Sequence, residues 1–358
     1  MIKNLSPSRA SQFKTCPKQF KYANVDKILE PTNEVQAKGT TVHQALEDLF
    51  DLPRDERTVE NLHNLFRAAW TKVRKSDEYN NLFSTIEEER KWGVESLELL
   101  TDYFKIENPT EFDPIERERW VKGEIDDLNL RGILDRMDRN ENGELVIVDY
   151  KSGSAPKIKY KEPRFFALKL YALLIKNEIG ELPAELKLIY LKNKTVHTLP
   201  VTEKMIENAK KEILEIWDEI KKAYLENKFP PKKNILCDYC HYKNICPVFN
   251  KNAPDTDYLG EINIEIEKIN EDIQNYDFDL INNQIIELEN EIGILNMFKE
   301  DDRENLIGIK NLNIINLETQ INELKIEKSN YLVLKEKLDD LNSKKEQFLN
   351  DINKLLQK

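Results

Sequence analysis

Two periods of hydrophobic residues divide the first part of the chain. Over about residues 45–110 the spacing is helical: steps of three and four place side chains on one helix face, a pattern that begins with Val42, Leu46, Leu49 and Phe50. Over about residues 115–201 the pattern changes. The stretches "NLRGILDRM" and "ELVIVDYK" are rich in branched apolar residues, and the "NENG" between them is a hairpin turn signal. We therefore expect a helical segment followed by a sheet.

One helix and two further strands are expected within the sheet region. "PRFFALKLYALLI" is an apolar helix, and "AELKLIYLK" and "KTVHTLPV" have the composition of a strand pair. Residues 202–228 have the period of an amphipathic helix, and the segment around 237–246 is irregular and rich in cysteine. Strands mixed with helices indicate an α/β protein.

Heptad spacing characterises residues 258–358. Steps of three and four recur at Ile281, Ile285, Leu288, Ile292 and Leu295, at Leu317, Ile321 and Leu324, and at Leu334, Leu338, Leu341, Phe348, Ile352 and Leu355. Lys328 and Lys345 interrupt this seam. The pattern predicts a coiled-coil tail. The polar stretch "KEDDRENLIGIKN" can be the turn of a helical hairpin within one chain, and pairing between two chains is the alternative. We expect the tail to bind a protein partner or to self-associate.

Length and charge agree with a division at residue 257. The chain has 358 residues, enough for two or three domains, and a formal net charge of -12. Most of this acidity lies in the tail, which from Glu261 onward has 12 basic and 22 acidic residues. The sequence has no run of eighteen apolar residues, so no membrane span is predicted. The start, "MIKNLSPSRASQF", lacks the apolar core of a signal peptide, so a cytoplasmic protein is expected.

An aspartate and a lysine end a strand that should be buried. Asp149 and Lys151 project to one face, because residues i and i+2 of a strand share a face, and Tyr150 points the other way. A hairpin can bring Asp135 beside Asp149, and a divalent cation relieves the repulsion between two such carboxylates. Oxygen ligands suit Mg²⁺ or Mn²⁺. Lys151 could orient an attacking water or stabilise charge on a phosphate.

A histidine is a further candidate ligand. His43 and Glu47 share one helix face in "GTTVHQALE", so His43 could contribute a nitrogen to the same metal or could simply be capped by Glu47. Likewise, Asp135 could form a surface ion pair with Arg136 instead of a metal site. A basic run that follows the lysine would contact phosphates or would only be solvated: Lys157, Lys159, Lys161, Arg164 and Lys169.

Four motifs occur in a definite order. They are Gly-x-x-x-His-x-x-Leu-Glu around His43, Gly-x-x-Asp-Arg-x-Asp around Asp135, apolar-Asp-Tyr-Lys-x-Gly around Asp149, and an apolar helix with Tyr171. This order resembles the RecB-like branch of the PD-(D/E)XK nucleases, which includes nuclease domains of bacterial break-repair helicases and CRISPR-associated adaptation exonucleases. The resemblance covers about residues 5–250. It implies a restriction-endonuclease-like core, a central mixed sheet flanked by helices.

The resemblance also implies roles for individual residues. Metals would be held by His43, Asp135, Asp149 and the main-chain carbonyl of Tyr150. Lys151 would be the catalytic lysine, and Tyr171 matches a family tyrosine on the helix after the active site. The family often has Gln four residues before that tyrosine, where this chain has Ala167, which puts one polar contact in doubt. In some members a glutamate on the preceding strand contributes, and the candidates are Glu118, Glu116 and Glu124.

The four cysteines form a pattern of one plus three. Cys16, in "FKTCPKQF", is followed much later by Cys237, Cys240 and Cys246, in "CDYCHYKNICP". In a cytoplasmic protein a metal site is expected rather than disulfides, and four thiolates can hold either zinc or a [4Fe-4S] cluster. The family resemblance implies the iron-sulfur cluster, which would tie the N-terminal helices to the end of the nuclease core.

These inferences predict a Mg²⁺- or Mn²⁺-dependent deoxyribonuclease. The substrate would be a DNA end or a single strand, the activity that of an exonuclease, and the setting DNA repair or recombination. The alternative is a non-catalytic DNA-binding or scaffold protein on a retained nuclease fold. The four chemically active residues, His43, Asp135, Asp149 and Lys151, argue against that alternative, because a scaffold does not need them. No phosphate-binding Gly-x₄-Gly-Lys-[Ser/Thr] loop is present, so a helicase would be a separate chain.

Overall fold

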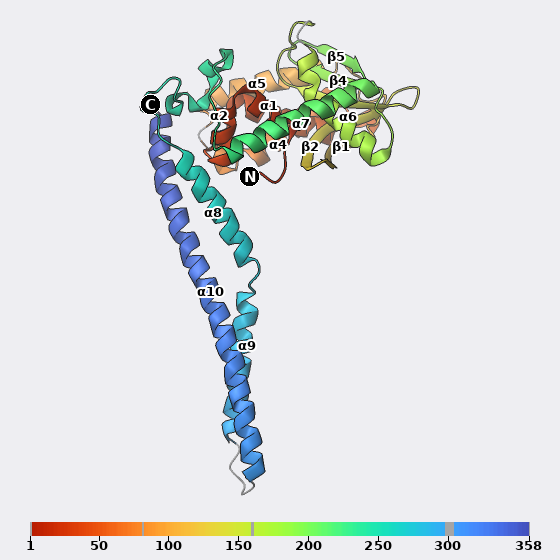
Figure 1. Ribbon diagram of the computed structural model, residues 1–358. Coiled ribbons are helices and arrows are strands. Elements are labelled where there is room, and N and C mark those ends of the chain that lie inside the picture. Colours follow the sequence, from red (N-terminus) through yellow and green to blue (C-terminus); the bar gives the residue numbers. More distant parts are fainter. Residues whose placement is uncertain (1, 81, 159–160, 298–303, 358) are drawn as a thin grey trace. The chain divides into compact units, whose positions relative to one another are not determined.

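Five strands form one mixed sheet in the order β1-β2-β3-β4-β5 (Figure 1). The computed structural model describes residues 2–80, 82–158, 161–297 and 304–357. These residues form two compact units, the first comprising residues 1–21 and 29–233 and the second residues 22–28 and 234–358. The sheet belongs to the first unit. The second unit therefore contains the cysteine-rich segment as well as the tail, and the functional division expected at residue 257 stays a prediction.

The strands follow the expected hairpins. β1 (Glu116–Ile125) pairs antiparallel with β2 (Leu128–Arg139), which pairs antiparallel with β3 (Leu145–Lys151) across the "NENG" turn. Gly143 has a φ of 79° in that turn, a conformation that costs glycine little. β3 then pairs parallel with β4 (Glu185–Tyr190), and β4 pairs antiparallel with β5 (Thr195–Pro200). The predicted sheet region and its hairpin are confirmed.

The connection between β3 and β4 contains the expected apolar helix. α6 (Phe166–Ile179) packs on β1, β2 and β3, and α7 (Glu203–Leu225) packs on α6. Most of the first ten residues of α6 are buried, which explains why its sequence is apolar on nearly all sides. Gly180, in the left-handed conformation with a φ of 75°, ends the helix.

Helices from the first hundred residues build a second core against the sheet. They are α3 (Glu34–Leu49), α4 (Val59–Val73) and α5 (Ile86–Tyr103), whereas the earlier α1 (Pro7–Thr15) packs on α6 and α7 and is followed by α2 (Pro17–Phe20). Apolar residues of α3, α4 and α5 pack with Val146, Val148 and Tyr150 of β3. Asn33 begins α3 with a capping box, in which its side chain accepts hydrogen bonds from Val35 and Gln36. The α/β class and the helix-flanked sheet are thus confirmed.

Among its described residues, the tail has three helices, where two were expected. α8 (Asp257–Ile273) and α9 (Phe278–Met297) both pack against the long α10 (Glu304–Leu356). Contacts run in opposite directions along the chain, from Tyr258 with Phe348 to Lys325 with Glu289, so the pairing is antiparallel. The heptad residues are therefore partly covered within one chain.

The proposed turn at residues 299–311 needs a correction. Residues 299–303 lie outside the described residues, but α10 already begins at Glu304, so the rest of that stretch is helix. Its single Gly308 is tolerated, because one glycine lowers helix propensity by only about 1 kcal/mol.

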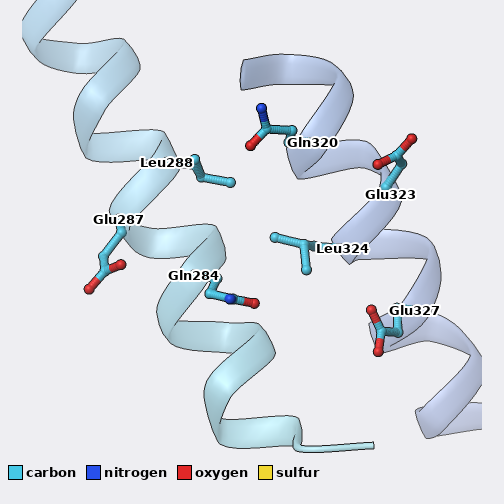
Figure 2. Close-up of a pocket in the computed structure, with 7 residues that line it drawn as sticks. All are labelled: Gln284, Glu287, Leu288, Gln320, Glu323, Leu324 and Glu327. Atoms are coloured by element: carbon cyan, nitrogen blue, oxygen red, sulfur yellow. The ribbon is translucent and has the colours of Figure 1, made fainter. Parts of the chain in front are cut away.

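Between α9 and α10, Leu288 and Leu324 point toward one another, with glutamine and glutamate side chains around them (Figure 2). None of the helices within the described ranges combines the length and the hydrophobicity needed to cross a membrane.

Candidate active site

The site begins where β2 and β3 cease to pair. Their ladder runs from Arg139 opposite Leu145 to Arg136 opposite Val148. At the next position the Oδ2 atom of Asp135 accepts a hydrogen bond of 2.8 Å from the main-chain N–H of Tyr150. A side chain thus replaces the neighbouring strand as the partner of that N–H group, which would otherwise be a costly buried donor. The predicted hairpin does bring Asp135 to the end of β3.

His43 of α3 reaches the same point from the other side. Its Nδ1 atom lies 3.3 Å from Oδ2 of Asp135, and its Nε2 atom lies 2.9 Å from the carbonyl oxygen of Tyr150. Both neighbours are acceptors, so the ring satisfies both only when both nitrogens carry a proton. Burial opposes that charge, but the hydrogen bond to Asp135 and its negative charge outweigh burial and raise the pKa of His43. Capping by Glu47 is excluded as the explanation for His43.

Glu118 completes a group of three potential metal ligands. Ligand atoms of His43, Glu118 and Asp135 all lie within 4.8 Å of one another. Among the described residues, no other set of three or more His, Cys, Asp or Glu side chains is so close. Burial, and then the charge of Asp135, raise the pKa of Glu118 to about 7. Of the three glutamates considered, Glu118 is therefore the one at the site.

The backbone of Glu118 is unusual. Its φ is 42°, in the left-handed region that costs a residue with a Cβ energy. The β1–β2 ladder pairs Arg117 with Arg136 and Arg119 with Leu134, but skips the position between them, where Glu118 would face Asp135. Such strain is found mainly where a surrounding structure fixes a functional side chain.

Asp149 and Lys151 form an ion pair with Oδ2 and Nζ 2.5 Å apart. Both side chains share one face, as the period of two predicts. Burial, and then repulsion by Asp135, raise the pKa of Asp149 to about 6. For Lys151, burial lowers the pKa, but attraction by Asp149 outweighs it and the net shift is upward. Asp149 is not in the group of three ligands, and its assignment as a ligand stays a prediction.

Tyr171 of α6 lies against the strand that carries Asp135. A Cβ atom built on Gly132 would come within 2.6 Å of Cε1 and 2.7 Å of the hydroxyl of Tyr171, so only glycine leaves room for this ring. Burial, followed by the charges of Asp149, Asp135 and Glu118, raises the pKa of Tyr171, which keeps it a neutral phenol. The structure thus brings Tyr171 close to the carboxylates.

A buried arginine supports the site from beneath. Arg136 is 1% exposed and does not pair with Asp135. Its guanidinium donates to both carboxylate oxygens of Glu107, at 2.8 and 2.9 Å, and to Asp138 at 3.1 Å. It also donates to the hydroxyl of Tyr150, the residue whose carbonyl and N–H face His43 and Asp135. The surface ion pair considered from sequence is therefore wrong, and Arg136 holds Tyr150 in place instead.

The basic run has mixed surroundings. Lys169 forms an ion pair of 3.1 Å with Glu162, and Lys161 donates to the carbonyl oxygen of Thr198 at 3.1 Å. Lys157 and Arg164 are exposed, and Lys159 lies outside the described residues. Two of the five residues thus have intramolecular partners that DNA would have to displace.

The four cysteines are divided between the two units. Cys237, Cys240 and Cys246 belong to the second unit and Cys16 to the first, and no three sulfurs are as close as the ligands of a single ion within the described part of the chain. Cys16 accepts a hydrogen bond of 3.4 Å from the N–H of Lys232, and Cys237 one of 3.3 Å from Asn234. The structure gives no support to a four-cysteine cluster.

A family comparison identifies the fold around this site. The model of the PD-(D/E)XK nuclease superfamily matches residues 4–247. The chain belongs to the PD-(D/E)XK nuclease superfamily. No curated protein matches the sequence. The acidic, histidine and lysine side chains at the end of β3 therefore lie in a nuclease fold.

Solved structures are similar over much of the chain. A protein from Eubacterium rectale, provisionally named an exonuclease, has a TM-score of 0.43 and 11% identity, over 67% of this chain and 88% of its own. A second protein, SSO0001, has a TM-score of 0.31 and 14% identity, over 70% of this chain and 88% of its own. Both TM-scores are below 0.5, and neither likeness bears on the activity of this chain.

Proposed function

We propose that this protein is a divalent-metal-dependent nuclease of the RecB-like branch that hydrolyses phosphodiester bonds in DNA. One observation carries the proposal: the ligand group of His43, Glu118 and Asp135 lies beside the ion pair of Asp149 and Lys151, at the open end of two strands. Two neighbouring carboxyl groups with raised pKa values are typical of functional sites.

The donor set fits a hard divalent cation. Glu118, Asp135 and the carbonyl of Tyr150 offer oxygen, which suits Mg²⁺ and Mn²⁺, and His43 adds a nitrogen that favours Mn²⁺ over Mg²⁺. Asp149 would complete the set once Lys151 turns toward substrate. Such a cation, when bound, neutralises phosphate charge and lowers the pKa of water. His43 must then lose the proton that Asp135 now stabilises.

The chain's own residues supply positioning and charge. Lys151, protonated because its pKa is raised, donates hydrogen bonds to a phosphate oxygen or to the attacking water. Tyr171, a neutral phenol, can donate one hydrogen bond to the substrate. Arg136 fixes Tyr150 and, through it, the carbonyl and N–H groups that face His43 and Asp135.

We propose DNA ends or single strands as substrate and exonuclease action as the mode, in DNA repair or recombination. Lys157 and Arg164, exposed on the segment after β3, would contact phosphates outside the cleaved bond. The tail would carry a protein partner.

The cysteine pattern remains part of the proposal. Thiolates of an iron-sulfur cluster bind different irons, so they lie farther apart than ligands of one ion, and the family resemblance is the argument for the cluster rather than for zinc. Protein purified without oxygen should contain about four irons per chain. One zinc and no iron would favour the alternative.

The decisive experiment is a cleavage assay on end-labelled single- and double-stranded DNA with Mg²⁺, Mn²⁺ or a chelator, beside the Lys151→Ala variant. Metal-dependent release of short products that Lys151→Ala abolishes is the expected result. DNA binding without any cleavage by the anaerobically purified wild type would favour the non-catalytic scaffold instead.

A further inference from the structure

The exposed side of the β1–β2 hairpin carries an apolar cross-strand pair followed by a basic one, and the proposed chemistry does not explain this arrangement. In the pairing register, Trp120 lies opposite Ile133, and Lys122 lies opposite Arg131. These four residues are exposed, whereas the intervening Val121 is buried, as alternation in a strand requires.

The hairpin leads directly away from the candidate active site. Glu118 and Asp135 lie two residues from the Trp120–Ile133 pair on their respective strands, and the Lys122–Arg131 pair lies two residues farther along. Each two-residue step along a strand is about 7 Å. An extended ligand leaving the carboxylates along these strands would therefore meet an apolar pair first and a basic pair next.

Trp120 is poorly explained as part of the core. It is 64% exposed, and its cross-strand neighbour Ile133 is 38% exposed, whereas Trp92 and Trp217 are each 3% exposed. A cross-strand pair of this kind stabilises a hairpin by only about 0.2–1 kcal/mol. The hairpin is at the edge of the sheet, because β1 is its first strand.

The neighbouring cations select the kind of ligand. Within the described part of the chain, neither Lys122 nor Arg131 has a carboxylate in ion-pair distance, in contrast to Lys169 and Arg139, which pair with Glu162 and Glu181. An exposed aromatic ring followed by free cations is the arrangement that binds unpaired nucleic acid, with bases stacked on the ring and phosphates along the charges.

We infer that the exposed face formed by Trp120, Ile133, Lys122 and Arg131 is a subsite for a single nucleic-acid strand, with one base stacked on Trp120. The inference rests on the proposed nuclease function and adds to it: the strand that enters the site is unpaired next to the cleaved phosphate. A duplex would have its bases buried in the stack and could not use the ring.

The test measures binding of a labelled single-stranded oligonucleotide by fluorescence anisotropy, with every variant made in the non-cleaving Asp149→Asn background. Trp120→Ala should raise the Kd about 5- to 150-fold, the range for loss of one stacked base, and Trp120→Phe should restore most of the affinity. Leu225→Ala, which removes an apolar side chain that is 88% exposed on α7, is the matched control and should change nothing.

Two further readouts separate stacking from a structural effect. Binding should quench tryptophan emission in the parent and not in Trp120→Phe, because the stacked ring is then absent. Lys122→Gln and Arg131→Gln should each reduce the slope of log Kd against log salt by about 0.7, while Trp120→Ala leaves the slope unchanged. Lys72→Gln, on exposed α4 surface, is the control for lost charge.

The outcomes distinguish the two proposals. If the wild type with Mg²⁺ or Mn²⁺ cuts no DNA, the nuclease proposal fails, whatever the oligonucleotide binding shows. If the wild type cuts DNA but Trp120→Ala binds single strands as tightly as the parent, only the subsite is overturned. A change in self-association of Trp120→Ala by light scattering, without a change in oligonucleotide affinity, would assign this face to protein contact and would also overturn the subsite.

Discussion

Lysines interrupt an apolar run in both units of the molecule, with opposite consequences. Lys151 ends the buried strand β3, and its pKa is raised because attraction by Asp149 outweighs burial. Lys345 interrupts the heptad seam of α10, and burial, followed by repulsion from Lys27, lowers its pKa. Lys151 thus has a carboxylate partner that stabilises its charge, whereas the surroundings of Lys345 disfavour its charge.

The difference shows when a charge in an apolar pattern indicates a site. A helix in a three-helix tail is open on one side, so a long lysine can extend its amine toward water. The carboxylate of Asp149, whose side chain is only 12% exposed beside Lys151, has no such exit, and a buried charge there requires a partner. The carboxylates around Lys151 are therefore a stronger functional signal than the interruptions in the tail.

The largest expected effect comes from replacing the carboxylate of one ion pair in each unit and measuring the cleavage rate. Asp149 pairs with Lys151 at 2.5 Å, and Asp340 of α10 pairs with Lys344 at 2.5 Å. Asp149→Asn should reduce the cleavage rate at least about 100-fold, since even outer partners of metal ligands contribute 10- to 100-fold. Asp340→Asn should leave the rate unchanged. Equal rates for Asp149→Asn and wild type, in protein free of contaminating nuclease, would remove Asp149 from the mechanism.

Burial should also decide what an arginine contributes to stability. Arg136→Met leaves Glu107 and Asp138 without their buried partner, so the free energy of unfolding should fall by about 3–5 kcal/mol in urea denaturation. Arg139→Met removes an arginine of the same strand whose ion pair with Glu181 is exposed, and should have little effect. Similar losses in both variants would contradict the supporting role of Arg136.

The metal affinity should rise with pH. Protons compete with a cation for Asp149 and Glu118, whose pKa values are raised to about 6 and about 7, so affinity for Mn²⁺ should be weak near pH 5 and increase through pH 7. Titration calorimetry should detect proton release, and Glu118→Gln should weaken binding about 10- to 100-fold and flatten the pH dependence. An unchanged affinity in Glu118→Gln would exclude this residue as a ligand.

The same raised pKa values set the stability of the metal-free protein. A carboxyl group whose pKa is raised in the folded state binds its proton more tightly there than in the unfolded chain. Its contribution is present at low pH and is lost as the pH rises toward 7. Mn²⁺ should offset this loss, which thermal denaturation at pH 5 and pH 8 can measure.

A smaller effect is expected from crowding at one glycine. Gly132→Ala places a methyl group against the ring of Tyr171, so unfolding free energy should fall by about 1–3 kcal/mol. Gly93→Ala in α5, where no atom lies within 4 Å of the new Cβ, should be neutral or stabilise the helix by up to about 1 kcal/mol. A stable Gly132→Ala variant would show that Tyr171 can move freely from the site.

The smallest effect concerns the tail. Lys345→Leu removes a cation whose pKa burial has lowered and adds an apolar side chain to the seam, so unfolding free energy should rise by at most about 1 kcal/mol. Cleavage should not change. If unfolding monitored by circular dichroism shows that Lys345→Leu is destabilised, Lys345 has a stabilising partner, as Lys151 has.

Much of the local structure was readable from the sequence. The period of two placed Asp149 and Lys151 together, the "NENG" turn placed Asp135 near Asp149, and the heptad spacing marked the tail. Each of these predictions depends on neighbours within one element or one hairpin. Backbone geometry fixes such relations, so the sequence carries them directly.

The remaining features required the tertiary structure. His43 meets the carbonyl of Tyr150 across 107 positions, and Glu118 joins them through a left-handed backbone that no residue pattern announces. Arg136 looked like a surface partner of Asp135 and is instead buried beneath Tyr150. α8, unassigned from the heptads, packs along α10 through Ile262 and Ile269. The sequence by itself determined which residues could do chemistry and which face of their own element they occupy. The packing of distant helices on the sheet decided which of them meet, because contacts between remote segments depend on the whole core rather than on any local pattern.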